Sequence, residues 1–284
     1  MSAQPVFQVK FWGVRGSTPT PERENLRFGG NTSCVEVRYG DQILILDAGS
    51  GIRNLGLSLL AERRQDLKMD VLLTHFHWDH IQGIPFFPPL FLEEAELHFF
   101  TSVTLAPLRE RLEGQMARPY FPVSLERLRA PRTFTEVDGF MQRGDLRITL
   151  FPLHHPQGAT GYRVESPAGV VVYATDVEHG NKELDRVLRE HAEGADILIH
   201  DAQYTPEEYA QSRGWGHSTW LEATKVAQDA KVKRLILFHH DPARTDAQND
   251  ILQDNARRRF ENTDGAAEGC AITIDNPRGS QAGS

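Results

Sequence analysis

The sequence THFHWDH, residues 74–80, constrains this chain more than any other stretch. It follows an apolar run directly and places three histidines and one aspartate within six positions. In an extended segment His75 and His77 point the same way, because side-chain direction repeats every two residues. If a helix begins near Asp79, the chain turns there, and Asp79 and His80 reach a second point nearby. Imidazoles and carboxylates bind zinc and similar ions, so one short segment can serve two metals.

Most of the other histidines also fall at predicted strand ends or in loops. The chain has 12 histidines. A single histidine at a strand end is more often a hydrogen-bonded structural residue than a ligand. The H-x-H-x-D-H pattern after an apolar strand reverses that preference and favours metal. The nine histidines at such positions are His75, His77, His80, His154, His155, His200, His217, His239 and His240.

The order of the predicted elements favours a layered α/β domain with its site along one sheet edge. Strands come first, and strands then alternate with helices. We expect one domain over residues 1–275, in which residues 85–150 form an insertion that shapes the substrate site, and a disordered tail over residues 276–284. Strands are predicted over 6–13, 33–40, 42–47, 69–75, 146–153, 161–166, 169–176, 195–202 and 233–241, and helices over 52–64, 103–117, 181–192 and 218–230.

Composition restricts the partners and the compartment. The chain carries 31 Lys and Arg against 39 Asp and Glu, a formal charge of −8, which repels nucleic acid unless a local basic patch exists. A small anionic substrate remains compatible, since a bound metal inverts the local field. Two cysteines, Cys34 and Cys270, form no zinc-ribbon or disulfide pattern. No signal peptide and no apolar run of 18 residues are found, so we expect a cytoplasmic protein that does not span a membrane.

The H-x-H-x-D-H pattern resembles the signature of the metallo-β-lactamase superfamily. Further segments follow in the order seen in the branch that holds RNase Z and related phosphodiesterases. GGNTS, HDAQ and GHST are similar to that branch's Asn-Thr-Ser, HEAT and HST segments. The resemblance implies an αββα sandwich, with two sheets face to face and helices outside. The segments are FWGVRGSTP, GGNTS, ILDAGSG, HPQGATGYRV, VVYATD, HDAQ, GHST and LILFHH.

The resemblance also implies two divalent metal ions and their ligands. We choose His155 over His154 because its spacing to the segment Gly161-Tyr162-Arg163 suits the RNase Z pattern. For the late ligand we choose His239, with His240 as the alternative. Nitrogen and oxygen ligands favour zinc, with manganese or iron as alternatives. The implied ligands are His75, His77 and His155 for one ion, Asp79, His80 and His239 for the other, and Asp176 between the two.

Such a site supports hydrolysis by a metal-bridging hydroxide. Asp79 and Asp176 would offset the charge of the ions, and Asp176 would also orient the nucleophile. His217 resembles the histidine of HST and is the candidate general acid or phosphate contact. Its alternative function is to cap the helix that starts near Ser218.

A polar loop is the candidate substrate contact. Asn31, Thr32 and Ser33 follow two glycines and can present backbone N–H groups and short polar side chains near the site. The alternative is a tight turn before the strand that begins near residue 34.

We therefore expect a dinuclear metal-dependent phosphodiesterase for a small phosphodiester such as a cyclic nucleotide. RNase Z carries a long tRNA-gripping arm between two of its ligands, but here His155 and Asp176 are only 21 positions apart. With the negative charge, this spacing argues against tRNA. Hydrolysis of a lactone, β-lactam or thioester is the first alternative, and a non-catalytic metal-binding sensor is the second. Family analogy also suggests a homodimer.

Overall fold

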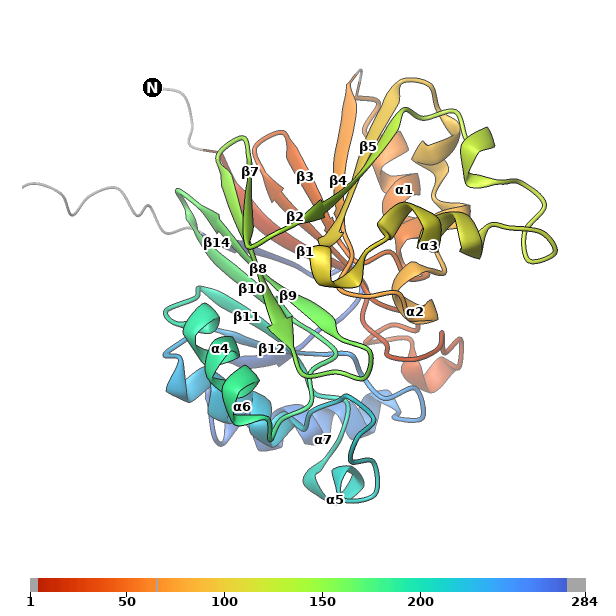
Figure 1. Cartoon of the computed structure of the whole chain (residues 1–284). Helices are drawn as coiled ribbons and strands as arrows, with labels where there is room; N and C mark the ends of the chain where they lie inside the picture. The colour runs from red at the N-terminus through yellow and green to blue at the C-terminus, as the bar shows by residue number, and fades with distance from the viewer. Residues whose placement is uncertain (1–4, 65, 275–284) are drawn as a thin grey trace, which may run out of the picture.

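Two β-sheets face each other in the computed structural model, and helices cover the outer face of each sheet (Figure 1). The structure describes residues 5–64 and 66–274. The αββα sandwich expected from the sequence is confirmed. The predicted tail over residues 276–284 lies outside the described residues.

The first sheet has the strand order β14-β1-β2-β3-β4-β5-β6. Pairing is antiparallel from β14 to β3 and parallel from β3 to β6. The strands are β1 (Phe7–Gly13), β2 (Cys34–Tyr39), β3 (Gln42–Leu46), β4 (Leu67–Leu72), β5 (Ala95–Ser102), β6 (Arg132–Val137) and β14 (Ala271–Ile274).

The second sheet has the order β13-β12-β11-β10-β9-β8-β7. Here β7 to β10 pair antiparallel and β10 to β13 pair parallel. Consequently β8, β10, β11 and β12 all run the same way. The strands are β7 (Phe140–Arg143), β8 (Leu146–Leu153), β9 (Ala159–Ser166), β10 (Gly169–Ala174), β11 (Ile197–Asp201), β12 (Leu235–Phe238) and β13 (Thr263–Gly265).

Helices complete the two outer layers. Within the described residues, no helix is both long enough and apolar enough to cross a membrane. The α-helices are α1 (Ile52–Ala61), α2 (Trp78–Ile81), α3 (Leu108–Gln115), α4 (Lys182–Ala192), α5 (Pro206–Tyr209), α6 (Trp220–Asp229) and α7 (Asp246–Arg257). Short 3-10 helices cover Arg23–Asn25, Ile84–Phe86, Pro88–Phe91, Val103–Leu105 and Leu125–Arg127.

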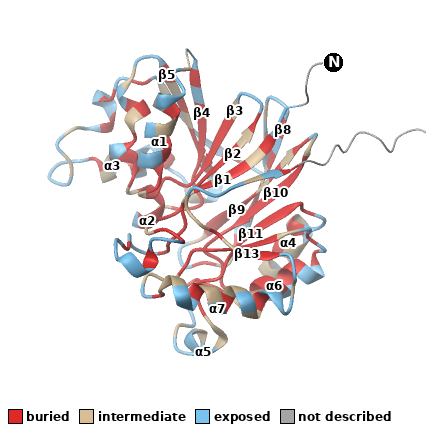
Figure 2. Cartoon of the chain, turned by 180° about the vertical axis from the view of Figure 1, so that it is seen from behind, coloured by how far each residue is buried: buried red, intermediate tan, exposed pale blue. Residues whose placement is uncertain are grey.

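Three apolar layers hold the sandwich together. Phe11, Tyr173 and Phe238 belong to the layer between the sheets. Leu55 of α1 lies in the layer beneath the first group of helices, and Leu188 of α4 in the layer beneath the second. Strand β10 is buried at every position, as expected for a strand covered on both faces. Figure 2 shows the buried strands between helices that expose their outer faces.

The sequence locates most strands but not all elements. The strand predicted over 146–153 coincides with β8. The helix predicted over 103–117 begins only at Leu108, because Pro107 precedes it and provides no backbone N–H. Residues 85–150, interpreted from the sequence as an insertion, contain β5, β6, β7 and the first part of β8, and these strands belong to both sheets. The division into a single domain over 1–275 stays a prediction.

Phe238 tests the packing between the sheets. Its ring is fully buried against Phe11 and Tyr173, so Phe238→Ala should lower the free energy of unfolding by about 3–5 kcal/mol. Phe140→Ala is the matched control, because Phe140 on β7 is 55% exposed and should change it by less than about 1 kcal/mol. Denaturant unfolding of chelator-treated protein measures both. Equal effects of the two substitutions would contradict this packing.

Candidate metal centre

Strands from both sheets end at one edge of the sandwich, and their ends carry the candidate ligands. His75 lies just beyond β4, His155 just beyond β8, and Asp176 just beyond β10. Asp201 ends β11, and His239 follows β12. Since parallel strands deliver their carboxyl ends to one edge, residues distant in sequence meet there.

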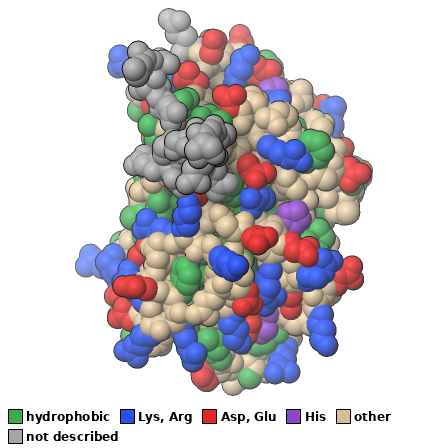
Figure 3. All heavy atoms as spheres, turned by 90° about the vertical axis from the view of Figure 1, so that its left-hand side faces the viewer, with side chains coloured by type: hydrophobic (Ala, Val, Ile, Leu, Met, Phe, Trp, Pro, Cys, Tyr) green, Lys and Arg blue, Asp and Glu red, His purple; other side chains and the backbone are tan. Residues whose placement is uncertain are grey.

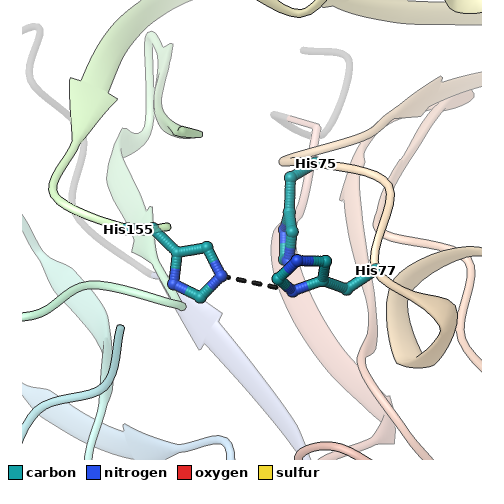
Figure 4. A group of neighbouring side chains, drawn as sticks. All are labelled: His75, His77 and His155. Atoms are coloured by element: carbon teal, nitrogen blue, oxygen red, sulfur yellow. Dashed lines mark hydrogen bonds between the residues drawn. The ribbon is translucent and has the colours of Figure 1, made fainter. Parts of the chain in front are cut away.

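The first donor group consists of His75, His77 and His155, whose ligand atoms lie within 4.8 Å of one another. Figure 4 shows the three rings converging, with Nε2 of His155 3.3 Å from Nδ1 of His77. His75 and His155 are buried, and His77 is half-buried. The structure thus brings together the three histidines proposed from the sequence as ligands of one ion.

The second donor group consists of Asp79, His80, Asp176 and His239, again within 4.8 Å. Nε2 of His80 lies 3.3 Å from Asp79 Oδ2, and Nε2 of His239 lies 3.2 Å from the same oxygen. Asp176 faces both groups, because its Oδ1 is 3.8 Å from His75 Nε2 and its Oδ2 is 3.1 Å from His80 Nε2. This position, between the two groups, is the one that a bridging ligand needs.

The two rival histidines point elsewhere. His154 donates from Nδ1 to the carbonyl of Glu178 (3.1 Å). His240 donates from Nε2 to the carbonyl of Ala266 (2.8 Å) and packs edge-on against Phe28. Of each adjacent pair, the structure brings His155 and His239 into the donor groups.

Three donor histidines are oriented by a hydrogen bond from the ring nitrogen that faces away from the centre. Nδ1 of His80 donates to Asp47 (2.8 Å) and Nδ1 of His239 to Oε1 of Gln203 (2.9 Å). Nδ1 of His155 donates to the carbonyl of Gly216 (2.9 Å). Each bond leaves a lone pair on Nε2, the usual arrangement around metal-binding histidines.

The donor set fits a cation. Nε2 of His80 and Nε2 of His239 are only 3.4 Å apart, and with both Nδ1 atoms donating, two lone pairs face each other. Nε2 of His75 is buried and has no hydrogen-bond partner within the described residues. A proton or a metal ion must offset this convergence, and imidazole with carboxylate suits zinc, manganese or iron. Together with the fold, these clusters indicate a site for divalent metal.

The pKa shifts of two histidines in the first donor group, and of the two carboxyl groups, agree with that fit. Burial lowers the pKa of His75 and of His155, which favours the neutral ring that binds metal. Burial opposes the charge on Asp79 and Asp176, but His80 and His239 outweigh it and lower the pKa of both carboxyl groups. The carboxylates therefore stay ionised inside the protein.

His217 and Asp201 form a pair beside the second donor group. Nδ1 of His217 lies 2.9 Å from Asp201 Oδ2 and 3.8 Å from Asp176 Oδ1. Burial works against the charged ring, yet the Asp201 carboxylate prevails and raises the pKa of His217 to about 9. The helix cap considered for His217 is supplied instead by Thr219, which accepts from the N–H of Glu222.

A buried glutamate, absent from the sequence-based site, holds the loop before His217. Glu178 accepts hydrogen bonds from the N–H groups of Gly214 and Gly216 (2.7 and 2.9 Å) and from the Tyr209 hydroxyl (2.9 Å). Gly216 has a φ of +88°, and a Cβ there would lie 2.2 Å from Nδ1 of His155. The loop must therefore carry glycine where it approaches His155.

The predicted substrate contacts mainly hold their own loop. Asn31 donates to Glu268 (2.9 Å) and accepts from Ser50 (3.0 Å). The Thr32 hydroxyl accepts from Gln82 (2.9 Å) and from the N–H of Ser50. The hydroxyl of Ser33 is buried without a partner within the described residues. These contacts match the alternative of a structural turn, and substrate contact by the three residues stays a prediction.

Asp47 is the other residue that the sequence analysis missed. It directly follows β3, and besides His80 it accepts from the backbone N–H of Thr74 (2.8 Å) and the Tyr173 hydroxyl (3.0 Å). It also has a φ of +60°, which is uncommon for a residue other than glycine. Its place directly after the apolar residues 43–46 of β3 does not reveal these distant contacts.

Comparison with known proteins identifies the family. The beta-lactamase superfamily domain matches residues 42–240, so the chain belongs to that superfamily, and the resemblance stated from H-x-H-x-D-H is confirmed. Ribonuclease Z of Thermococcus kodakarensis is 28% identical over 289 aligned residues, which cover 82% of this chain and 84% of that protein. The chain is accordingly a hydrolase, as expected.

Solved structures share the fold. YhfI from Bacillus subtilis, a metallo-β-lactamase fold protein, has a TM-score of 0.73 at 20% identity and covers 95% of this chain and 99% of its own. A diphosphatase of the PhnP family has a TM-score of 0.68 at 18% identity, covering 94% and 97%. Human tRNase Z, short form, has a TM-score of 0.65 at 19% identity, covering 94% and 99%. At these identities the likeness concerns the fold alone.

The expectation of a small anionic substrate without tRNA is wrong. It is contradicted by the relatives named Ribonuclease Z. The net charge of −8 describes the whole chain, and Figure 3 shows both signs interspersed over one face. The net charge therefore does not exclude contact with RNA, since a bound cation would reverse the local field.

Asp47→Asn tests the orientation of His80. The amide cannot accept from Nδ1 as strongly as the carboxylate, so we expect metal affinity to fall about 10- to 100-fold. Competition with a chromophoric chelator measures the affinity, and circular dichroism verifies folding. Asp145→Asn, on an exposed turn, is the matched control and should bind metal like the unmodified chain. Unchanged affinity in folded Asp47→Asn would refute this function of Asp47.

Proposed function

We propose that this protein is a two-metal phosphodiesterase that hydrolyses a phosphodiester of RNA. The observation that supports it most is Asp176, whose two oxygens face two separate donor groups while the His217–Asp201 pair lies beside them. Two adjacent metal sites suit in-line displacement at phosphorus.

His75, His77 and His155 would hold one ion, and Asp79, His80 and His239 the other, with Asp176 shared. Zinc is the favoured metal. When bound, the pair of ions supplies a water nucleophile of lowered pKa and positive charge for the phosphoryl oxygens. Asp79 and Asp176 offset part of that charge, and the outward hydrogen bonds of His80, His155 and His239 keep their rings aimed at the ions.

His217 is proposed to act on the leaving group. Its Nδ1 is engaged with Asp201 (2.9 Å), so Nε2 is the ring nitrogen left to face a substrate. A ribose alkoxide leaves poorly and needs a proton, and a positioned histidine is the commonest donor. Asp201 holds the ring and favours its charged form.

RNA is proposed as the substrate because of the relatives. The matched Ribonuclease Z proteins align with this chain over most of both lengths. The segment between His155 and Asp176 contains the β9–β10 hairpin, so RNA would be held by other parts of the surface.

Metal-loaded protein should hydrolyse both bis(p-nitrophenyl) phosphate and a tRNA transcript with a 3′ extension. Two metal ions per chain are expected by elemental analysis, and chelation should abolish both activities. His77→Ala removes one donor of the first group and should reduce turnover by at least about 100-fold. Activity on the simple diester without RNA cleavage would sink the RNA proposal alone. Two bound ions without activity on any diester would sink both and favour lactones or thioesters.

His217→Ala separates a proton donor from a structural residue. With RNA the leaving alkoxide needs the proton, so we expect kcat to fall about 10²- to 10⁴-fold. With bis(p-nitrophenyl) phosphate the nitrophenolate leaves unaided, and the loss should stay below about 10-fold. Both rates are measured at equal metal content. Equal losses on the two substrates would show that His217 does not protonate the leaving group.

A further inference from the structure

A cavity of about 690 Å³ lies beside the first donor group. His75 and His77 form part of its wall, and its other walls come from α2, α3 and the loops around them. Its volume is in the usual range for ligand sites, about 300–1,000 Å³. Anything bound at the donor groups through these two histidines would therefore extend into this space.

Two large aromatic side chains line the cavity without being packed. Trp78 is 63% exposed and Tyr120 is 75% exposed. Neither ring stacks on another ring or on a cation within the described residues. Phe121 behaves differently, because it packs edge-on against Phe86 with 5.6 Å between ring centroids. The loop that contains Tyr120 and Phe121 is thus anchored through Phe121 and leaves Tyr120 on the cavity.

A cation accompanies the aromatic rings. Arg111 of α3 lines the same cavity, and its guanidinium makes no ion pair or hydrogen bond that the described residues reveal. Helix α3 is fixed to the metal-binding segment, since Nε2 of Gln115 donates to the carbonyl of Ile81 (2.8 Å). The position of Arg111 is therefore coupled to α2, which carries Asp79 and His80.

We propose that this cavity binds the nucleotide next to the scissile phosphate, with its base against Trp78 and Tyr120 and its phosphate near Arg111. This inference rests on the proposed phosphodiesterase function and names the part of the substrate that determines selectivity. Bases stack on exposed aromatic rings, and arginine pairs with phosphate. Trp78 lies between His77 and Asp79 in sequence, so a base stacked on its ring lies near the donor groups.

The test compares two diesters that share a leaving group. Thymidine 5′-(p-nitrophenyl phosphate) carries a base, whereas methyl p-nitrophenyl phosphate does not. The ratio of kcat/KM for the first diester to kcat/KM for the second therefore reports on contacts with the nucleoside. We expect Trp78→Ala to reduce this ratio about 5- to 150-fold, the range measured for stacking of one base. Trp78→Phe should keep most of it, and Tyr120→Ala should reduce it as well.

Phe140→Ala is the matched control, because Phe140 is exposed on β7 and does not line the cavity. Its ratio should equal that of the unmodified protein. Equal losses on both diesters in Trp78→Ala would overturn the proposal, since Trp78 would then act through the metal ligands beside it. If Trp78→Ala left the ratio of the two kcat/KM values unchanged, the proposal would be overturned too.

A binding measurement separates this inference from the phosphodiesterase proposal. Thymidine 5′-monophosphate is titrated into metal-loaded protein by calorimetry, with Trp78→Ala alongside. If no diester is hydrolysed but the nucleotide binds and Trp78→Ala weakens binding at least about 5-fold, the nucleotide site stands and the phosphodiesterase proposal falls. Diesters could instead be hydrolysed while substitution of Trp78 or Tyr120 changes neither nucleotide binding nor the kcat/KM ratio. In that case only the proposed nucleotide site is refuted.

Discussion

The structure depends on a concentration of buried carboxylates and imidazoles at one edge of the sandwich. Asp47, Asp79, Asp176 and Asp201 are all buried, and the lone pairs of several imidazoles point inward among them. Burying charges is costly unless they are paired. This cost falls at one edge, where the strand ends of both sheets meet, and a bound cation would offset it. Metal binding and stability should therefore be coupled.

Backbone strain accompanies this arrangement. Asp47, Asp176 and His239 directly or nearly follow the strands β3, β10 and β12, and each has a φ between 55° and 61°. Residues other than glycine adopt this left-handed backbone conformation at a cost of about 1–3 kcal/mol each. The turn ends the strand and redirects the side chain into the centre. The apolar layers on both faces of each sheet hold the strands that impose these turns.

The residues proposed from the sequence as ligands lie together in the donor groups, and their function as metal ligands stays a prediction. The histidines of H-x-H-x-D-H can be located from their spacing, and His155, His239 and Asp176 can be located only with the family resemblance. Asp47 and Glu178 could not be located, because their importance lies in contacts with Tyr173 and Gly216, far away in the chain. The pairing of β14 with β1 was missed for the same reason, since register between distant strands leaves no local signal.

The residues proposed to select the substrate lie in a different part of the fold from the metal donors. The donor atoms come from strand ends that the sandwich places rigidly, whereas the cavity beside them is lined by loops and by α3, where substitutions cost little stability. A whole-chain property such as net charge contains no information about that cavity. Trp78 joins the two parts, since its neighbours on both sides face the metal centre and its own ring faces solvent. An exposed tryptophan gains nothing for folding, so its position within the ligand motif points to contact with whatever the centre cleaves.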